Sequence, residues 1–334
     1  MRPIGDLAQF MLSKQMQSRL RTSADIAGQE TTTGLTNDIA QHLGGASIAV
    51  SLLDRKMELL GQHKHGIAEA RVFASASQTV LAEIQDQSSQ LINSLALASQ
   101  MQSASELKVL SEKAAQAMID IVNALNSKIG GKYLFAGSDT QSKPLPDGIS
   151  LVAMLRSEVS GATTVGDVRN AINTWFETSG GAFETLAYAG SDTGFLQMPI
   201  GNGESAKFGL RADGESVRGL IQALGIAAFA TDSSIALGTT DQKKLLTDGY
   251  NALRQIDLSL TEERAGLGLI EASIENAKIA AEMEISRIER DRLSLIGIDQ
   301  FEAASKFESA QQQLDVFYRI AARQGRTSLA EYLR

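Results

Sequence analysis

Cysteine is absent from the 334 residues of the sequence. Its absence excludes disulfide bonds, thiolate catalysis and metal sites built on cysteine. It fits the reducing cytosol, and it equally fits an exported protein that must stay unfolded and unlinked in transit. No apolar run near the start is long enough for a signal peptide, and none approaches the roughly 18 residues of a transmembrane helix. We therefore expect no membrane partner, and any export would use a route other than the general secretory signal.

Aromatic residues are also scarce, at 5% of the chain, and there are only four prolines and one tryptophan. A large compact core would have to rely on aliphatic side chains. A composition poor in aromatics and rich in Ala, Leu, Ser, Gln and Glu is typical of long packed helices. The length of the chain allows two or more domains.

The net charge is −8 and the isoelectric point is about 5.1. Binding to nucleic acid needs a basic surface that displaces counterions from phosphates, so we expect no nucleic-acid partner. Both ends of the chain are nevertheless locally basic, with four cationic residues each: Arg2, Lys14, Arg19 and Arg21, and Arg319, Arg323, Arg326 and Arg334. A solvated helix face is the simplest interpretation of these two segments.

A seven-residue repeat runs from Ala46 to about Ser127. Its two rows are Leu60, Ile67, Ala74, Leu81, Ser88 and Leu95, and Ala70, Ser77, Ile84, Leu91 and Ala98. Alternating steps of three and four residues predict a helix with a partner helix alongside. The phase shifts around Gln100–Ser105 and the repeat then resumes. At about 1.5 Å per residue, one helix of this extent would reach roughly 120 Å.

The partner helix is predicted near the other end of the chain. The same spacing recurs there at Leu267, Ile270, Ile274, Ala277 and Ala281. Ile285 and Ile288 continue it after two successive steps of four residues, which is a stutter. Gly297 breaks the chain, and a last helix follows with one apolar face: Ala303, Phe307, Ala310, Leu314, Phe317 and Ala321. This face could be buried within one molecule or against neighbouring subunits, and spacing does not separate the two.

Residues 3–27 predict a thin amphipathic helix that Gly28 ends. Its apolar contributors are Leu7, Phe10, Met11 and Leu20. A helix with so thin an apolar stripe is marginal alone and needs a partner to bury that face.

The middle of the chain, residues 138–248, has a different composition. It contains three of the four prolines and the only tryptophan, Trp175. A structureless insert of this length would be unusual, so we expect a folded domain. Leu196–Asp213 reads as a hairpin that turns at Asn202-Gly203. Helices are expected over 165–176 and over 216–230, the second with Ser216 as its N-cap.

The predicted fold is mainly α, with a long antiparallel helical coiled coil or bundle formed by both chain ends and an inserted α+β domain. Five divisions are expected along the chain. These are an N-terminal assembly segment that is disordered or partly helical in the monomer (1–45), an N-terminal helical arm (46–137), the inserted domain (138–248), a C-terminal helical arm (249–297) and a C-terminal assembly helix (298–334).

No arrangement of residues resembles an active site. His63 and His65 are two apart on a predicted helix and point in different directions, so they do not form a metal site. Gly201-x-Gly203 and Gly266-x-Gly268 do not complete a phosphate-binding motif, and we interpret them as turn glycines. Motifs of hydrolases and nucleotide-binding enzymes are missing. We predict a protein that is not an enzyme, with no catalytic residue, no metal and no cofactor.

Three segments resemble the bacterial flagellin superfamily, and within it the hook-associated proteins of the hook–filament junction. "GKYLFAGSDT" (131–140) is similar to the element that closes the long N-terminal helix in those proteins. "LTEERAGLGLIEASIENA" (260–277) is similar to the start of their C-terminal arm, and "IGIDQFEAASKFESAQQQLDVFYRIAARQ" (296–324) to their closing helix. The segment "TTTGLTNDIAQHLGG" (31–45) departs from the family, because it lacks the basic pair and the proline usual there.

The resemblance implies a structural adaptor that joins the hook-associated zone to the flagellin filament. The implied partners are other copies of this chain, the first hook-associated protein, flagellin and a type III export chaperone, and the implied location is the extracellular flagellum. The assembly interface would use seven apolar residues: Leu7, Phe10, Met11, Phe307, Leu314, Phe317 and Ile320. A plug that closes the helix would consist of Tyr133, Leu134, Phe135 and Gly137.

Two alternatives stay open. The first is a flagellin filament subunit, since the chain ends in "LAEYLR" and flagellins have similar endings. The second is a cytoplasmic coiled-coil signalling hairpin, which is also rich in Ala, Ser, Gln and heptads. The long folded insert argues against the signalling hairpin, which turns tightly at its tip.

Overall fold

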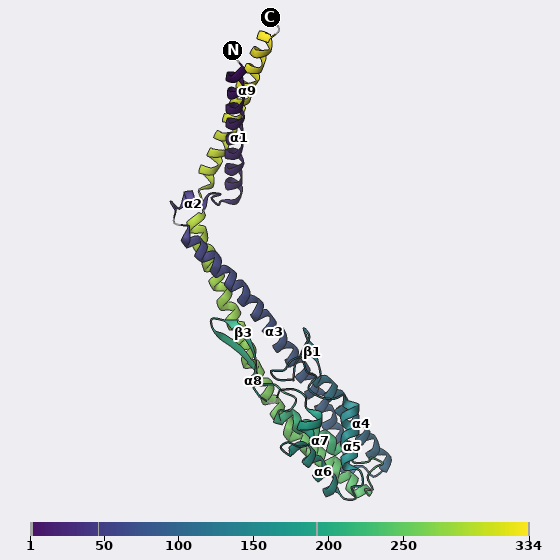
Figure 1. The fold of residues 1–334 in the computed structure, drawn as a ribbon. Helices are drawn as coiled ribbons and strands as arrows, with labels where there is room; N and C mark the ends of the chain where they lie inside the picture. Colours follow the sequence, from purple (N-terminus) through teal and green to yellow (C-terminus); the bar gives the residue numbers. More distant parts are fainter. Residues whose placement is uncertain (1–2, 46, 192, 333–334) are drawn as a thin grey trace. The chain divides into compact units, whose positions relative to one another are not determined.

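The computed structural model describes residues 3–45, 47–191 and 193–332, except for the side chains of residues 3–7, 9 and 324–332. Its fold is mainly α-helical with small β elements, as the sequence predicts (Figure 1). Contacts divide the chain into two compact units. The first contains Met1–Gly61 with Glu282–Arg334, and the second contains Gln62–Ala281.

In the first unit the two terminal helices, α1 (Pro3–Thr33) and α9 (Gln300–Tyr332), lie side by side (Figure 1). Gln17 Nε2 donates a hydrogen bond to the Tyr318 hydroxyl over 3.2 Å. Because Gln17 meets Tyr318 and Gly28 meets Phe307, the two helices run antiparallel. This is the pairing of both chain ends that the sequence predicts.

Gly28 does not end the first helix, contrary to the sequence-based expectation, and α1 continues to Thr33. A Cβ placed on Gly28 would lie 3.1 Å from Cε2 of Phe307. The missing side chain therefore makes room for the aromatic ring of α9. A glycine that looks like a helix breaker in the sequence is here a packing residue between two helices.

The non-helical segment that follows α1 pairs with the non-helical segment that precedes α9. Leu35 and Gly297 form an antiparallel bridge. The Thr36 N–H donates to the Ile296 carbonyl (2.9 Å), and the Ile298 N–H donates to the Gly34 carbonyl (3.0 Å). The short helix α2 (Ile39–His42) follows, and the Asp38 side chain accepts from the Gln41 N–H at its start. Gly297 interrupts the chain as predicted, since α8 ends at Ile296.

Two long helices, α3 (Ile48–Leu95) and α8 (Thr239–Ile296), contribute to both units. Every member of the two predicted heptad rows, from Leu60 to Ala98, is buried. On α8, Leu267, Ile274 and Ile288 are buried as well. Gly266 and Gly268 lie inside α8, so their interpretation as turn glycines was wrong.

The expectation of one continuous helix from Ala46 to Ser127 is also wrong. Helix α3 ends at Leu95, a 3-10 turn covers Ala98–Gln100, and α4 (Ala104–Leu125) follows. The Ser103 side chain accepts from the Ser105 N–H, and Glu106 accepts from the Ser103 N–H. This capping box starts a new helix where the sequence shows only a shift of phase. At about 1.5 Å per residue, α3 alone spans roughly 70 Å.

In the second unit, α3 and α8 share a polar layer in addition to their apolar contacts. Arg264 Nη1 donates to Gln85 Oε1 over 2.6 Å. Gln85 Nε2 in turn donates to Thr261 Oγ1 (2.9 Å) and to Asp257 Oδ1 (3.3 Å). Since any slip of one helix along the other would break these hydrogen bonds, the layer favours one register.

Helix α4 packs against α5 (Gly148–Val159) and α7 (Glu215–Ala228), with α6 (Val165–Glu177) beside them. The predicted helix over 165–176 is confirmed. Trp175, Phe176 and Phe183, the last in a π-helical turn (Phe183–Ala187), form a buried aromatic cluster. Ser216 is not the N-cap that was expected, because α7 begins at Glu215 and its N-cap is Gly214, two residues earlier.

The predicted hairpin is confirmed as β3 (Leu196–Gly201) paired antiparallel with β4 (Glu204–Phe208). Asn202 and Gly203 both have positive φ, at 52° and 78°, as the turn requires. The inward side chains alternate and are buried: Met198, Ile200, Ala206 and Phe208. The ring of Phe208 lies edge-on to that of Phe73 in α3, with centroids 4.8 Å apart. The second unit is thus mixed α+β.

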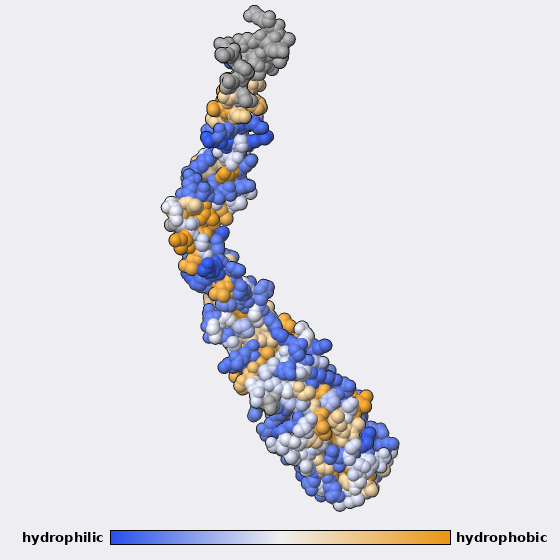
Figure 2. Space-filling view, in the orientation of Figure 1, coloured by the Kyte–Doolittle hydropathy of each residue, from blue (hydrophilic) through white to orange (hydrophobic). Residues whose placement is uncertain are grey.

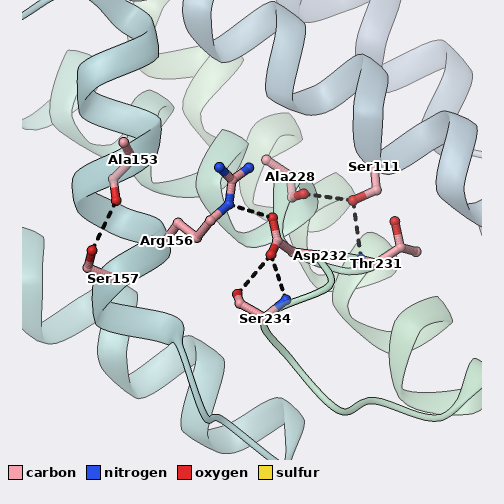
Figure 3. A network of polar contacts seen from close by, with 8 residues as sticks. All are labelled: Ser111, Ala153, Arg156, Ser157, Ala228, Thr231, Asp232 and Ser234. Carbon is pink, nitrogen blue, oxygen red and sulfur yellow. Dashed lines mark hydrogen bonds and ion pairs between the residues drawn. The ribbon is translucent and has the colours of Figure 1, made fainter.

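A polar network fixes the segment between α7 and α8 (Figure 3). The buried Ser111 hydroxyl donates to the Ala228 carbonyl (2.7 Å) and accepts from the Thr231 N–H (3.2 Å). Asp232 accepts from the Ser234 N–H (2.9 Å) and from Arg156 Nε (2.9 Å). These bonds hold α4, α5 and the connecting segment together.

Candidate assembly surface

The paired helices α1 and α9 expose large apolar side chains. Phe10, Met11, Leu12 and Met16 on α1 are each more than half exposed, and so are Phe301, Val316 and Ile320 on α9. Figure 2 shows apolar surface recurring over the part of the molecule that α1 and α9 build. Burying such a side chain is favourable by about 1.5–3 kcal/mol relative to leaving it in water. The exposed apolar side chains of α1 and α9 therefore favour contact with another apolar surface.

The predicted interface residues fall into two groups. Phe307, Leu314 and Phe317 are half-buried, and Phe307 packs against Gly28 of α1. Phe10, Met11 and Ile320 are exposed. The side chain of Leu7 lies outside the described residues. That neighbouring molecules bury these side chains remains a prediction for all seven interface residues.

A groove of about 420 Å³ runs between the two helices. Its apolar lining comes from both: Met16, Leu20, Val316, Phe317 and Ile320. The sequence-based interface missed Leu12, Met16 and Val316. On α1 a usable signal was present, because Leu12, Met16 and Leu20 follow one another at four-residue steps and so share one helical face.

Towards the chain breaks the groove becomes polar. A neighbouring cavity of about 570 Å³ is lined by Glu30, Glu302 and Lys306, among others. Lys306 Nζ lies 2.9 Å from Glu302 Oε1, and the hydrogen bond to this carboxylate raises the pKa of Lys306. The lining between the two helices thus changes from charged to apolar.

Ion pairs connect α3 and α8 within the first unit. Lys56 Nζ lies 2.5 Å from Glu284 Oε1, and Arg292 Nε donates to Asp54 Oδ1 over 2.8 Å. Hydrogen bonds from Arg287, and then from Lys56, lower the pKa of Glu284 to about 2. These groups are solvent-exposed, so they contribute little to stability. They match charges across the two helices and so favour this antiparallel alignment.

A small hairpin of β1 (Lys128–Ile129) and β2 (Lys132–Tyr133) comes after α4. The predicted plug begins in this hairpin, because Tyr133 is the last residue of β2, and its N–H donates to the Thr140 carbonyl (2.9 Å). Leu134 and Phe135 are buried, and the Leu134 N–H donates to the Ser127 carbonyl (3.0 Å) just beyond the end of α4. The Phe135 carbonyl accepts from the Ala212 N–H (2.8 Å). Gly137 has a φ of 68°, and a Cβ there would lie 2.9 Å from the Ser191 carbonyl oxygen. The segment thus joins three parts of the second unit.

Within the described part of the chain, no group of His, Asp and Glu side chains is arranged to hold a metal ion. His63, one of the two histidines considered for such a site, instead lies against Gly201 at the hairpin turn. The described helices also include none that is long and apolar enough to cross a membrane.

The fold is therefore that of a helical protein whose two ends pair and expose an apolar face, with an α+β insert. It is similar to FlgL from Bacillus cereus, at 14% identity and a TM-score of 0.50, over 73% of this chain and 99% of that one. A protein assigned as a flagellar hook-associated protein from Vibrio parahaemolyticus is 10% identical, with a TM-score of 0.41, over 72% of this chain and 96% of that one. No family model and no curated protein matches the sequence.

At such low identity the likeness to FlgL concerns the fold. It confirms the fold expected from the resemblance to the flagellin superfamily.

Proposed function

We propose that this chain is a structural subunit of the bacterial flagellum and acts as the adaptor between the hook-associated zone and the flagellin filament. The observation that carries the proposal is the likeness of the fold to FlgL over 99% of that chain. The apolar surface of α1 and α9 supports it, because a subunit that is buried on assembly needs such a face. The proposed partners are other copies of this chain, the first hook-associated protein and flagellin, with a type III export chaperone before assembly.

Non-enzymatic action is part of the same proposal. The polar groups of the described cavities belong to ion pairs and helix faces, such as Glu302 with Lys306, rather than to a converging set of catalytic groups. The proposed location is the extracellular flagellum.

A deletion of the gene tests the proposal. Cells would be imaged by electron microscopy while flagellin is assayed in the medium. Bare hooks with flagellin shed into the medium are the expected result, because the filament would lack its attachment. Bare hooks without major flagellin in cells or medium would identify the chain as the filament subunit. Normal filaments and normal swimming would overturn both assignments and favour the signalling hairpin.

A further inference from the structure

The turn between β3 and β4 contains an asparagine that is followed directly by a glycine. Asn202 is exposed, and every other asparagine of the sequence precedes a residue larger than glycine. The Asn202 amide forms no hydrogen bond with another described residue. A Cβ placed on Gly203 would meet nothing within 4 Å. The side chain of Asn202 and the main chain of Gly203 are therefore free to approach each other.

These two groups can react with each other. In the first step the Gly203 nitrogen attacks Cγ of Asn202, the bond from Cγ to Nδ2 breaks, and the amide leaves as ammonia with the proton of the Gly203 N–H. In the second step water opens the resulting succinimide ring. Attack at Cγ gives aspartate, and attack at the main-chain carbonyl carbon gives isoaspartate, in which the main chain runs through the side chain. Glycine favours the first step, because it has no Cβ to hinder its nitrogen.

The β ladder beside the turn is weak, which makes the turn easy to open. Asn202 and Gly203 rest at positive φ, at 52° and 78°. Ring closure requires another main-chain conformation at Asn202, so the turn must open briefly. Pro199 has no N–H to donate to Ser205, and the register shifts between Pro199 and Gly201. Segments held by few hydrogen bonds open at little cost in free energy.

The structure protects an asparagine that also precedes a small residue. Asn126 is followed by Ser127 at the end of α4. Its Oδ1 accepts from the Leu145 N–H (3.0 Å), and its Nδ2 donates to the Pro146 carbonyl (3.2 Å). Because both ends of this amide are bonded, its Cγ is not free to meet the following nitrogen.

Two further asparagines are exposed but lack one of the two conditions. Asn93 precedes Ser94 within α3, where the N–H groups are part of the helical ladder. Asn37 lies in the non-helical segment after α1, but the side chain of Asp38 hinders the nitrogen that would attack. Exposure, an open main chain and a following glycine are thus combined at Asn202.

We propose that Asn202 is a site of spontaneous modification, at which the exposed turn converts the amide to aspartate and isoaspartate. The reaction consumes water and needs no partner molecule. The proposal is independent of the proposed function.

The modification would change the hairpin in two ways. Either product adds a carboxylate next to the exposed Glu204. Aspartate tolerates positive φ as asparagine does, so this product keeps the turn. Isoaspartate lengthens the main chain of a two-residue turn, so this product should shift the pairing of Gly201 with Glu204. Because Gly201 lies against His63 of α3, the isoaspartate form should also loosen the packing of the hairpin on α3.

Peptide mapping of the ageing protein tests the site. The full-length protein is incubated in heavy-oxygen water at mildly alkaline pH. Samples taken over time are digested and analysed by mass spectrometry, with fragmentation that separates aspartate from isoaspartate. Heavy oxygen should enter position 202 in a first-order process that gives both products. Asn202 should react at least about tenfold faster than Asn93 and Asn126, because those two need a more costly local opening.

The following glycine and the folded structure both contribute to this ratio, and unfolding separates them. In urea, Asn93 and Asn126 lose their protection, so their rates should rise by about tenfold or more. The rate at Asn202 should change much less. An equal rise at all three would show that the folded turn protects Asn202 as well, and the proposal would then fail.

Asn202→Gly is the matched variant, because two glycines also suit this turn and the reactive amide is removed. On ion exchange, the aged wild-type protein should acquire a more acidic species that the aged variant lacks. The same amount of acidic species in the variant would place the reaction elsewhere in the chain. That result, or the absence of heavy oxygen at position 202 in the wild type, would overturn the proposal.

Discussion

The carbonyl oxygen of Pro199 lies where a side chain on Gly66 would begin. A Cβ built on Gly66 would be 2.4 Å from this oxygen, closer than any real Cβ contact. The oxygen belongs to the backbone of β3, so it cannot move away as a flexible side chain would. The hairpin therefore packs on α3 at the one kind of residue that allows such an approach.

We expect Gly66→Ala to displace the hairpin and lower the free energy of unfolding by about 1–3 kcal/mol, since overpacking costs this much. Gly266→Ala is the control, because Gly266 also lies within a long helix but has open space around its Cα. Alanine there should stabilise the protein by about 0.5–1 kcal/mol. Urea unfolding of both variants measures the difference, and equal effects would argue against the close approach.

Ser111→Ala should destabilise the second unit by about 1–3 kcal/mol, because the Ala228 carbonyl and the Thr231 N–H would lose their buried partner. Ser157→Ala is the matched change, since the Ser157 hydroxyl bonds only to the Ala153 carbonyl, on the exposed face of α5 (Figure 3). It should stay within about 0.5 kcal/mol of the wild type. Thermal unfolding distinguishes the two, and a neutral Ser111→Ala would contradict the role given to this hydroxyl.

Stability should fall in acid partly through Asp232. Burial raises the pKa of this carboxyl, but the hydrogen bonds from Ser234 and Arg156 outweigh burial, and the net pKa is lowered. The folded state thus favours the charged form. Its contribution is complete above the ordinary carboxyl pKa of about 4 and is lost as pH falls through the lowered value.

Asp232→Asn should therefore flatten the decline of unfolding free energy below about pH 4, as measured by urea titrations at a series of pH values. Part of the slope should remain, because Asp167 also has a lowered pKa, through its hydrogen bonds with Thr164 and Thr163. An unchanged slope in the variant would count against the network.

The face of α1 and α9 can be tested without disturbing the insert. Phe10→Ser and Ile320→Ser should each weaken assembly, since each removes an exposed apolar side chain worth about 1.5–3 kcal/mol when buried. The thermal transition of the second unit should stay unchanged. Gln15→Ser, an exposed polar position on α1, is the control for sedimentation and motility assays. Removal of the residues after Leu314 should likewise abolish assembly and leave the thermal transition of the second unit unchanged. Loss of that transition in the truncated chain would contradict the prediction.

The sequence allowed the faces of the long helices to be predicted, because burial on a helix follows a simple period. Ala74, Leu81 and Ile84 are buried for this reason. The turn after Leu95 was missed, although the capping box of Ser103 and Glu106 was present in the sequence, because a shift of phase is also what a stutter produces. The length of the apolar repeat alone does not distinguish one long helix from two shorter helices joined by a turn.

Glycines and caps were less predictable, because their roles depend on residues far away in the chain. Gly28 lies inside α1 and leaves room for the ring of Phe307, and Ser216 lies inside α7, where its hydroxyl bonds to Glu263 of α8 (3.4 Å). In the candidate site, Met16 shared a helical face with Leu12 and Leu20 in the sequence, but Val316 could be identified only once α1 and α9 were seen to form one groove. Contacts of this kind join residues far apart in the sequence, so a local sequence pattern does not predict them.

The hydrogen bond between Gln17 and Tyr318 joins residues 301 positions apart. During synthesis, α1 is made first and α9 last, so α1 waits without its partner while nearly the whole chain is produced. The contacts among α4, α5 and α6 are between neighbours in sequence and can form early. Once α3 and α8 have paired, they bring the two ends together and shorten the loop that α1 and α9 must close. We therefore expect the two terminal helices to become ordered last and to stay available to other molecules for longest.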